Sequence, residues 1–255
     1  MSVFFKNDEA KFFSGGIITH VIFDFDGILV DTERLYSKAN EEILFSQHGE
    51  TFTNNEKALM MGLVKPKAVE ALLKAFKIND PTAVDQYMKA YDAKIEELFA
   101  VETKVLPGAI SLVNHLYKYN IPLAICTGSD ATEFKHKTVN PEIAEWLEKI
   151  PLRLLCGSDP EITYCKPHPE PYLKLIQRFN NEKPVSPENV LVFEDSVNGV
   201  RSALDAGCNV IMVPQIEFLP EGLVEDELRS HPNLVEILES LTEFQPENYG
   251  LPAFS

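Results

Sequence analysis

Val21-Ile-Phe-Asp-Phe-Asp-Gly-Ile-Leu-Val-Asp31 joins a short apolar run to two aspartates and a glycine. The run before Asp24 is apolar without strict alternation, which is typical of a strand buried on both faces of a parallel sheet. Asp24 and Asp26 lie two positions apart, so their side chains project from the same side of an extended chain. Gly27 permits a sharp turn and leaves room for a ligand close to the backbone. The segment therefore predicts an acidic site at the end of a core strand.

Further apolar runs end in small or polar residues in the same way, and segments with the spacing of amphipathic helices separate them. This alternation predicts a doubly wound parallel sheet, an α/β fold. The expected strands are 19–23, 122–126, 152–156, 190–193 and 210–213, and the expected helices between them are 109–119, 171–179 and 196–206.

The region between the first two strands breaks this alternation, because its periodicity is helical throughout. We expect an inserted helical bundle, so that residues 1–32 and 105–255 form the α/β core and residues 33–104 form a second, smaller domain. The tail from Phe244 to Ser255 is aperiodic and holds two prolines, which predicts an extended strap packed on the core. The candidate helices of the insert are 33–48, 54–61, 67–76 and 83–99.

The chain has 255 residues and a formal net charge of −16. Such an acidic surface repels nucleic-acid backbones and acidic membranes, so neither is an expected partner. The apolar stretch at 17–30 is interrupted by two aspartates and is too short to span a bilayer. In the absence of a signal-peptide pattern, we expect a cytoplasmic protein with reduced thiols, without disulfides or a zinc site. The cysteines form no CxxC pair and stand at Cys126, Cys156, Cys165 and Cys208.

The aspartate pair indicates the chemistry. Two carboxylates this close repel each other unless a cation or a shared proton lies between them. Mg²⁺ meets that need, since it binds a few carboxylates together with phosphate oxygens of a substrate. One carboxylate can then attack phosphorus and form an acyl phosphate, while the other protonates the leaving oxygen and later activates water. The alternative, two acids in a solvated turn, is disfavoured by the apolar strand before them and the glycine after them.

Two other segments carry groups that can bind phosphate. Thr127-Gly128-Ser129 ends a core strand, where a hydroxyl and free N–H groups can hold a phosphate. A helix N-cap followed by a turn is an equally good interpretation of that segment alone. Lys166 stands in a loop stiffened by Pro167 and Pro169, and its ammonium can neutralise both a phosphate and the attacking carboxylate. A surface lysine is the alternative there, and we interpret the neighbouring His168 as a loop residue, because an aspartate already fills the acid role.

Glu194-Asp195-Ser196 follows the fourth of the expected strands. Acids at the end of a buried strand are costly unless they bind a cation or cap the next helix. We favour metal ligation by Asp195, with Glu194 as a further ligand or as a residue that supports the ligands. In an open parallel sheet, ligands bind beyond the carboxyl ends of the strands near the topological switch. The strand ends therefore predict one site for phosphoryl transfer.

Taken in order, these segments resemble the four motifs of the haloacid dehalogenase-like hydrolases. The matching segments are Asp24-Phe-Asp-Gly-Ile-Leu-Val-Asp-Thr32, Thr127, Lys166-Pro and Glu194-Asp195. The helical insert is similar to the helical cap of that family. The resemblance covers most of the chain and implies an α/β core with a cap, Mg²⁺ as the cofactor and a small phosphorylated metabolite as the substrate.

The resemblance also implies a role for each matching residue. Asp24 corresponds to the nucleophile and Asp26 to the acid/base. Asp24, the backbone carbonyl of Asp26 and Asp195 would hold Mg²⁺, with Glu194 as a further candidate. Phosphate-binding groups are expected at Thr127, Gly128 and Lys166.

A second set of segments resembles the pseudouridine-5′-phosphatase branch of this family, which implies a nucleotide-like monophosphate substrate such as pseudouridine 5′-monophosphate. One position and one loop depart from the pattern: Ile28 stands where the wider family usually has threonine, although an apolar residue also occurs there in this branch, and the loop at 62–67 is longer than in the relatives. In that loop Lys65 and Lys67 are candidate substrate contacts. The resembling segments are Asp31-Thr-Glu-Arg-Leu-Tyr36, Met61-Gly62, Gly157-Ser-Asp-Pro-Glu161, Val192-Phe-Glu-Asp195 with Asn198-Gly-Val200, and the tail at Phe244-Gln-Pro-Glu247 and Tyr249-Gly-Leu-Pro252.

Several functions use these residues, and we expect a monomeric phosphatase that acts on a small phosphorylated metabolite. A sugar-phosphate phosphatase or a phosphomutase would use the same chemistry, and a mutase would interconvert sugar phosphates with little free phosphate. A dehalogenase is disfavoured because displacement of a halide needs no leaving-group acid such as Asp26. An idle binding protein would show a degraded site, whereas every expected polar position is filled here.

Overall fold

The structure, a computed structural model, describes residues 17–60, 65–179, 184, 186–215 and 226–254. It divides into two compact units. The α/β unit comprises Met1–Val30, Val105–Phe134 and Pro141–Ser255, and the helical unit comprises Asp31–Lys104 and Lys135–Asn140. The sequence-based division places residues 135–140 with the α/β core instead. The predicted Met61-Gly62 segment and the first part of the 62–67 loop lie outside the described residues.

The α/β unit is built on a six-stranded sheet in the order β3-β2-β1-β4-β5-β6, and every pairing in it is parallel. The predicted doubly wound sheet is therefore confirmed. The chain leaves β1 toward β2 and β3 and then returns to β4 on the other side of β1, which makes the ends of β1 and β4 the topological switch. The strands are β1 (His20–Phe23), β2 (Leu123–Thr127), β3 (Leu152–Leu155), β4 (Val190–Glu194), β5 (Asn209–Met212) and β6 (Leu234–Ile237).

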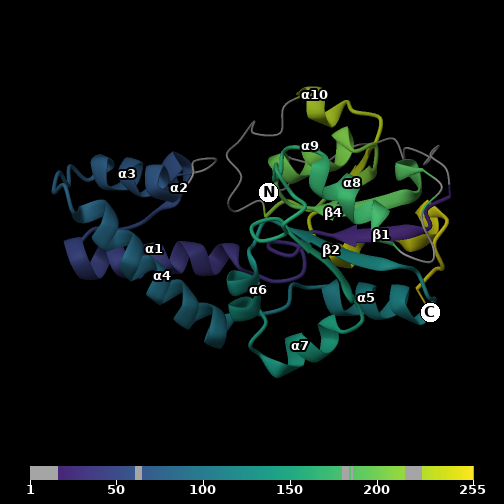
Figure 1. The fold of residues 1–255 in the computed structure, drawn as a ribbon, viewed down its shortest axis with the longest axis horizontal. Helices are drawn as coiled ribbons and strands as arrows, with labels where there is room; N and C mark the ends of the chain where they lie inside the picture. The colour runs from purple at the N-terminus through teal and green to yellow at the C-terminus, as the bar shows by residue number, and fades with distance from the viewer. Residues whose placement is uncertain (1–16, 61–64, 180–183, 185, 216–225, 255) are drawn as a thin grey trace. The chain divides into compact units, whose positions relative to one another are not determined.

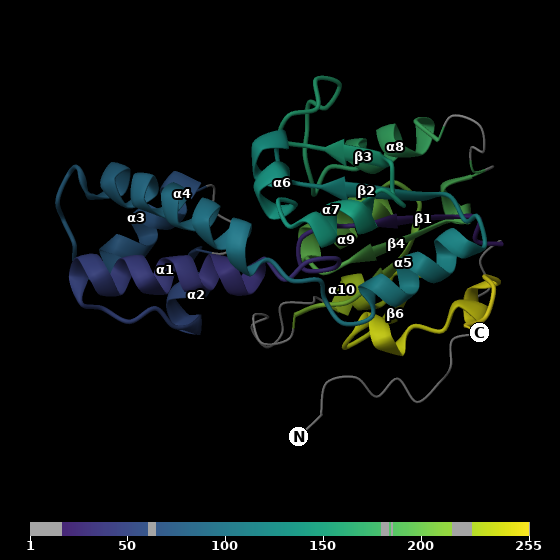
Figure 2. The same ribbon diagram turned by 90° about the horizontal axis from the view of Figure 1, so that it is seen from below.

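Helices cover both faces of this sheet. Figures 1 and 2 show α8 (Glu170–Gln177) and α9 (Val197–Asp205) on one face, and α5 (Ala109–Lys118) and α7 (Pro141–Leu147) on the other. The sequence pattern did not indicate β6 or the short helices α6 (Ala131–Lys137), α7 and α10 (Asp226–Arg229). These elements are short, and β6 is an edge strand with a glutamate in its middle. Neither the helical nor the strand periodicity therefore runs long enough to be recognised in the sequence.

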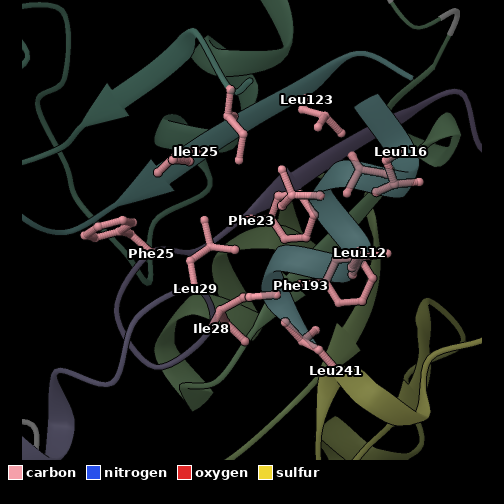
Figure 3. Packing of buried hydrophobic residues seen from close by; sticks show 14 of the residues in the cluster. Phe23, Phe25, Ile28, Leu29, Leu112, Leu116, Leu123, Ile125, Phe193 and Leu241 are labelled. Atoms are coloured by element: carbon pink, nitrogen blue, oxygen red, sulfur yellow. The ribbon is translucent and has the colours of Figure 1, made fainter. Parts of the chain in front are cut away.

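Successive residues of the central strands bury against opposite faces. Phe23 and Phe193 join the cluster under α5, whereas Ile22 and Val192 join the cluster under α8 and α9. The rings of Phe23 and Phe193 stack with centroids 5.2 Å apart, and Figure 3 shows them beside Leu112 and Leu116 of α5. All of these side chains are fully buried, which explains why the strands carry no polar alternation.

The tail packs on the α/β unit, although it is not the extended strap that its prolines suggested. It forms one 3-10 turn, η4 (Pro246–Tyr249), and follows another, η3 (Leu241–Glu243), and the ends of these turns direct apolar side chains inward. Phe244 packs edge-on against Phe193 at 4.9 Å and stacks on Tyr249 at 5.4 Å. Burial of these rings explains the turned conformation, because a straight strap would expose half of its side chains.

We predict that Phe244→Ala destabilises the protein by about 3–5 kcal/mol, because it leaves a cavity beside the central strands. Phe254→Ala is the matched control, since Phe254 lies in the same tail but is 43% exposed, against 2% for Phe244. The control should cost about 1 kcal/mol or less. Urea unfolding of both variants measures the difference, and a loss for Phe244→Ala as small as that expected for the control would contradict a stabilising role for this ring.

The helical unit has its own apolar core. Leu44, Leu72 and Tyr87 are fully buried there, and the hydroxyl of Tyr87 donates to Asn40 Oδ1 at 3.1 Å. Lys137 is also buried, with its ammonium 5.1 Å from the ring centroid of Phe99, which explains why residues 135–140 belong to this unit. The helices are α1 (Glu33–His48), α2 (Asn54–Met60), α3 (Lys65–Ala75) and α4 (Ala83–Glu102). Among the described residues, no helix is long and apolar enough to cross a membrane.

Candidate active site

Asp24 lies at the switch point of the sheet. The register pairs Phe23 with Ile125 of β2 and with Phe193 of β4, so Asp24 follows directly between the ends of these strands. Its N–H donates to the carbonyl oxygen of Phe193 at 2.9 Å, which extends the ladder and fixes the backbone of Asp24. The residue is 7% exposed, so its carboxylate is nearly buried but reachable.

The turn after Asp24 is anchored in the core. Phe25, Ile28 and Leu29 are buried, and Leu29 N–H donates to the carbonyl oxygen of Phe25 at 2.9 Å. Figure 3 shows these three side chains in the packed cluster. The isoleucine at position 28 therefore contributes to packing beneath the site, which accounts for an apolar residue at this position.

Gly27 brings the turn against Asp195. Its φ of +75° lies in the left-handed region, and a Cβ atom there would stand 2.0 Å from Asp195 Oδ2. Two features require glycine here: the left-handed backbone conformation and the carboxylate that lies against the position of a Cβ atom. Asp195 is thereby placed beside the Asp24–Asp26 turn, as the sequence predicted.

Lys166 reaches the same point from the loop after β3. Its Nζ donates to Asp24 Oδ1 at 2.8 Å, to Glu194 Oε1 at 2.5 Å and to the carbonyl oxygen of Cys126 at 2.8 Å. The lysine side chain is 11% exposed, so the ammonium is held inside the site and is not a surface charge. The surface-lysine alternative is therefore excluded by the structure.

Asp26 is oriented by two hydroxyl groups. Ser129 Oγ donates to Asp26 Oδ2 at 2.9 Å, and Thr127 Oγ1 donates to the same oxygen at 3.2 Å. Thr127 Oγ1 also accepts from the N–H of Ser129 at 3.1 Å, so the segment turns sharply after β2. Beside it, a Cβ atom on Gly128 would meet nothing within 4 Å, which leaves space at this position.

Glu194 is fully buried at the end of β4. Its Oε1 accepts from Lys166 and from the hydroxyl of Tyr172, the latter at 2.7 Å. Its Oε2 accepts from the N–H of Asp195 at 3.2 Å and from Oγ of Ser196 at 3.3 Å. A Cβ atom on Gly199 of α9 would stand 2.0 Å from this carboxylate, so the glycine makes the room that Glu194 occupies.

The carboxylates form a set that fits a hard cation. One oxygen each of Asp24, Glu194 and Asp195 lies within 4.8 Å of the others, and oxygen ligands of this kind suit Mg²⁺. Burial raises the pKa of Asp24 to about 8, and the neighbouring Glu194 and Asp26 carboxylates add to the rise while Lys166 opposes it. Burial lowers the pKa of Lys166, but the carboxylates of Asp24 and Glu194 outweigh it and hold that pKa well above its ordinary range. The Lys166 shift reflects the negative charge gathered around it, and a bound cation would neutralise part of that charge.

The structure therefore brings together most residues that the sequence singled out: Asp24, Asp26, Thr127, Lys166, Glu194 and Asp195. Lys65 and Lys67 belong to the helical unit, where Lys65 pairs with Asp92 and both lysines are exposed. His168 is a loop residue as interpreted, since its Nδ1 accepts from the N–H of Glu170 at 3.2 Å. The four cysteines are free, with no disulfide among them.

The sequence reasoning gave no role to Ser129, Tyr172 or Gly199. Ser129 stands in the segment already chosen for Thr127, so its hydroxyl was a signal that could have been used. Tyr172 and Gly199 lie on helical faces whose neighbours depend on how α8 and α9 pack, and the sequence offers no local signal for that.

Comparison with known proteins agrees with this geometry. The family model described as haloacid dehalogenase-like hydrolase matches residues 21–213. (DL)-glycerol-3-phosphatase 2 of Arabidopsis thaliana is 35% identical over 98% of this chain and 98% of its own length. A probable pseudouridine-5′-phosphatase of Drosophila melanogaster is 36% identical over 93% of this chain and 96% of its own length.

Solved structures show the same fold. A crystal structure of a putative β-phosphoglucomutase from Thermotoga maritima superposes with a TM-score of 0.68 at 26% identity, covering 89% of this chain and 96% of that one. The family match spans all four segments that form the site, from β1 to the end of β5. With its parallel sheet, its clustered carboxylates and its phosphatase relatives, this chain belongs to the haloacid dehalogenase-like hydrolases and is a phosphatase of that family.

Proposed function

We propose that this chain is a magnesium-dependent phosphomonoesterase that hydrolyses a small phosphorylated metabolite through a phosphoryl group carried on Asp24. The observation that carries the proposal is the contact of Asp24 with Lys166 beside the oriented carboxyl of Asp26. Nucleophile, positive charge and proton donor thus lie at one edge of the sheet. Such a set is sufficient for transfer of a phosphoryl group to a carboxylate and then to water.

Asp24 provides the attacking oxygen, since it contacts Lys166 and, at 7% exposure, can be reached by a substrate, whereas Glu194 is fully buried. The ammonium of Lys166 offsets charge on the transferring phosphoryl group as the carboxylate becomes an acyl phosphate. A Mg²⁺ ion held by Asp24, the backbone carbonyl of Asp26 and Asp195 would supply the positive charge that lets an anionic substrate approach an ionised carboxylate. Glu194 supports this set by holding Lys166, because both of its oxygens accept hydrogen bonds from the protein.

Asp26 acts as the acid and then as the base. In the first step it protonates the leaving oxygen, and in the second it takes a proton from the water that hydrolyses the acyl phosphate. The hydroxyls of Ser129 and Thr127 hold its Oδ2 and so orient the carboxyl group for proton transfer. Gly128 and Thr127 supply backbone groups for the phosphate at the open side of this turn.

The relatives of this chain support two candidate substrates. The pseudouridine-5′-phosphatase relative supports pseudouridine 5′-monophosphate, and the glycerol-3-phosphatase relatives support glycerol 3-phosphate at similar identity. We assign substrate choice to the helical unit acting as a cap, with Lys65 and Lys67 as candidate contacts. A phosphomutase is the second candidate, supported by the structural match to a putative β-phosphoglucomutase.

A phosphate-release assay tests the proposal. We expect Mg²⁺-dependent release of inorganic phosphate from pseudouridine 5′-monophosphate or glycerol 3-phosphate, and much slower release from uridine 5′-monophosphate and hexose phosphates. Chelation of the metal should abolish turnover, and added Mg²⁺ should restore it. Interconversion of sugar phosphates without free phosphate would identify a mutase instead, and no turnover of any of these compounds would contradict both enzymes.

A further inference from the structure

Tyr172 touches both ends of the ion pair beside the nucleophile. It lies on α8 and is fully buried. Its hydroxyl donates to Glu194 Oε1 at 2.7 Å, and the Lys166 ammonium lies 5.2 Å from the centroid of its ring. A buried tyrosine hydroxyl needs a hydrogen-bond acceptor, and here that acceptor is a carboxylate of the site.

The position of the Lys166 ammonium depends on the three acceptors to which it donates hydrogen bonds. A lysine ammonium has three N–H donors, and all three have acceptors here: Asp24, Glu194 and the carbonyl oxygen of Cys126. The carbonyl is held by the backbone of β2, so it cannot follow the ammonium. Any movement of the Glu194 carboxylate therefore changes the distance between Lys166 and the oxygen of Asp24 that receives the phosphoryl group.

Glu194 Oε1 is shared between the ammonium and the tyrosine hydroxyl. Each donor takes part of the charge on this oxygen, so the hydroxyl weakens the hold of Glu194 on Lys166. If the hydroxyl is removed, Glu194 Oε1 loses one of these two donors and its anchor on α8, so the carboxylate can shift; the ammonium, already 2.5 Å from Oε1, then moves with it relative to Asp24. We infer that Tyr172 is a positioning residue for phosphoryl transfer, which acts through Glu194 to keep the Lys166 ammonium on the phosphoryl side. The inference rests on the proposed function, because it assigns a role within the same site.

Tyr172→Phe removes one oxygen and keeps the ring. We expect kcat to fall about 10-fold with little change in KM, since the lost alignment matters most when charge develops on the transferring group. Tyr249→Phe is the matched control. Tyr249 is also buried in the α/β unit and also donates to a carboxylate, Glu236 Oε2 at 2.6 Å, but it is no part of the site. The two variants should lose similar thermal stability, and only Tyr172→Phe should lose kcat.

A double-mutant cycle separates positioning from packing. If Tyr172 acts through Glu194, Tyr172→Phe in a Glu194→Gln background should lower kcat no further than Glu194→Gln alone. If Tyr172→Phe alone does not fold, the cause on this account is the under-paired charge of Glu194. The double variant, which lacks that charge, should then fold again.

These outcomes decide the inference. It is overturned if Tyr172→Phe keeps the kcat of Tyr249→Phe, if the effects of the two site substitutions on kcat multiply independently, or if the double variant stays unfolded when Tyr172→Phe is unfolded. Failure of the proposed function shows itself differently, as a wild-type protein that releases no phosphate from any compound tested.

Discussion

Asp24→Asn should lower phosphatase turnover by roughly 10³-fold or more, because an amide oxygen cannot form the acyl phosphate on which both steps depend. The folded state should not suffer. Burial, which raises the pKa of Asp24 to about 8, makes the ionised carboxylate unfavourable in the folded protein, and the substitution replaces it with a neutral amide of the same size. Thermal unfolding should therefore occur at the wild-type temperature or above it, while phosphate release is lost.

Asp85→Asn is the control for this experiment. It makes the same chemical change at an exposed position in the first turn of α4 and should leave turnover unchanged. Acid-quenched wild-type protein should carry a phosphoryl group on the peptide that contains Asp24, and the Asp24→Asn protein should carry none. Full activity of Asp24→Asn, or a phosphoryl group on another residue, would refute the assignment of the nucleophile.

Gly27→Ala should raise the Mg²⁺ concentration needed for half-maximal activity by about 10- to 100-fold, the range typical when a residue that supports metal ligands is altered. The added methyl group would stand 2.0 Å from Asp195 Oδ2, so the carboxylate must move away from the turn that holds Asp24. Titration of activity with Mg²⁺, and of metal binding by calorimetry, measures the shift.

Gly49→Ala separates this displacement from backbone strain. Gly49 has a φ of +70°, close to the +75° of Gly27, and a Cβ atom there would meet nothing within 4 Å. Both substitutions should lose about 1–2 kcal/mol of stability from the left-handed conformation alone. Only Gly27→Ala should also change the Mg²⁺ requirement, and an equal requirement in both variants would argue against Asp195 as a metal ligand.

The arrangement of the site follows from the common direction of the strands in the parallel sheet. Strands that run in the same direction end at the same edge, so residues far apart in sequence meet without long loops. Asp24 and Glu194 are both placed in this way, by the ends of β1 and β4. Lys166 is the exception, since a loop carries it, and its three acceptors on Asp24, Glu194 and Cys126 hold it there in place of a strand.

The sequence by itself determined the sheet, the order of the four segments and the acidic pair. Apolar runs such as the one before Asp24 have few ways to be buried, and polar residues at their ends must lie at an edge. It also indicated the helical insert, because periodicity over 16 or 20 residues in α1 and α4 is long enough to recognise. Short elements such as β6 left no comparable signal.

Only the tertiary structure decided which side chains complete the site. Tyr172 reaches Glu194 across 22 positions, and Ser129 reaches Asp26 across 103, through the packing of α8 on the sheet and the turn after β2. It also decided that the tail turns inward at Phe244 and that residues 135–140 join the helical unit around Lys137. Local patterns fix how a segment buries its own apolar face, whereas contacts between segments depend on how those faces fit together, which no single segment encodes.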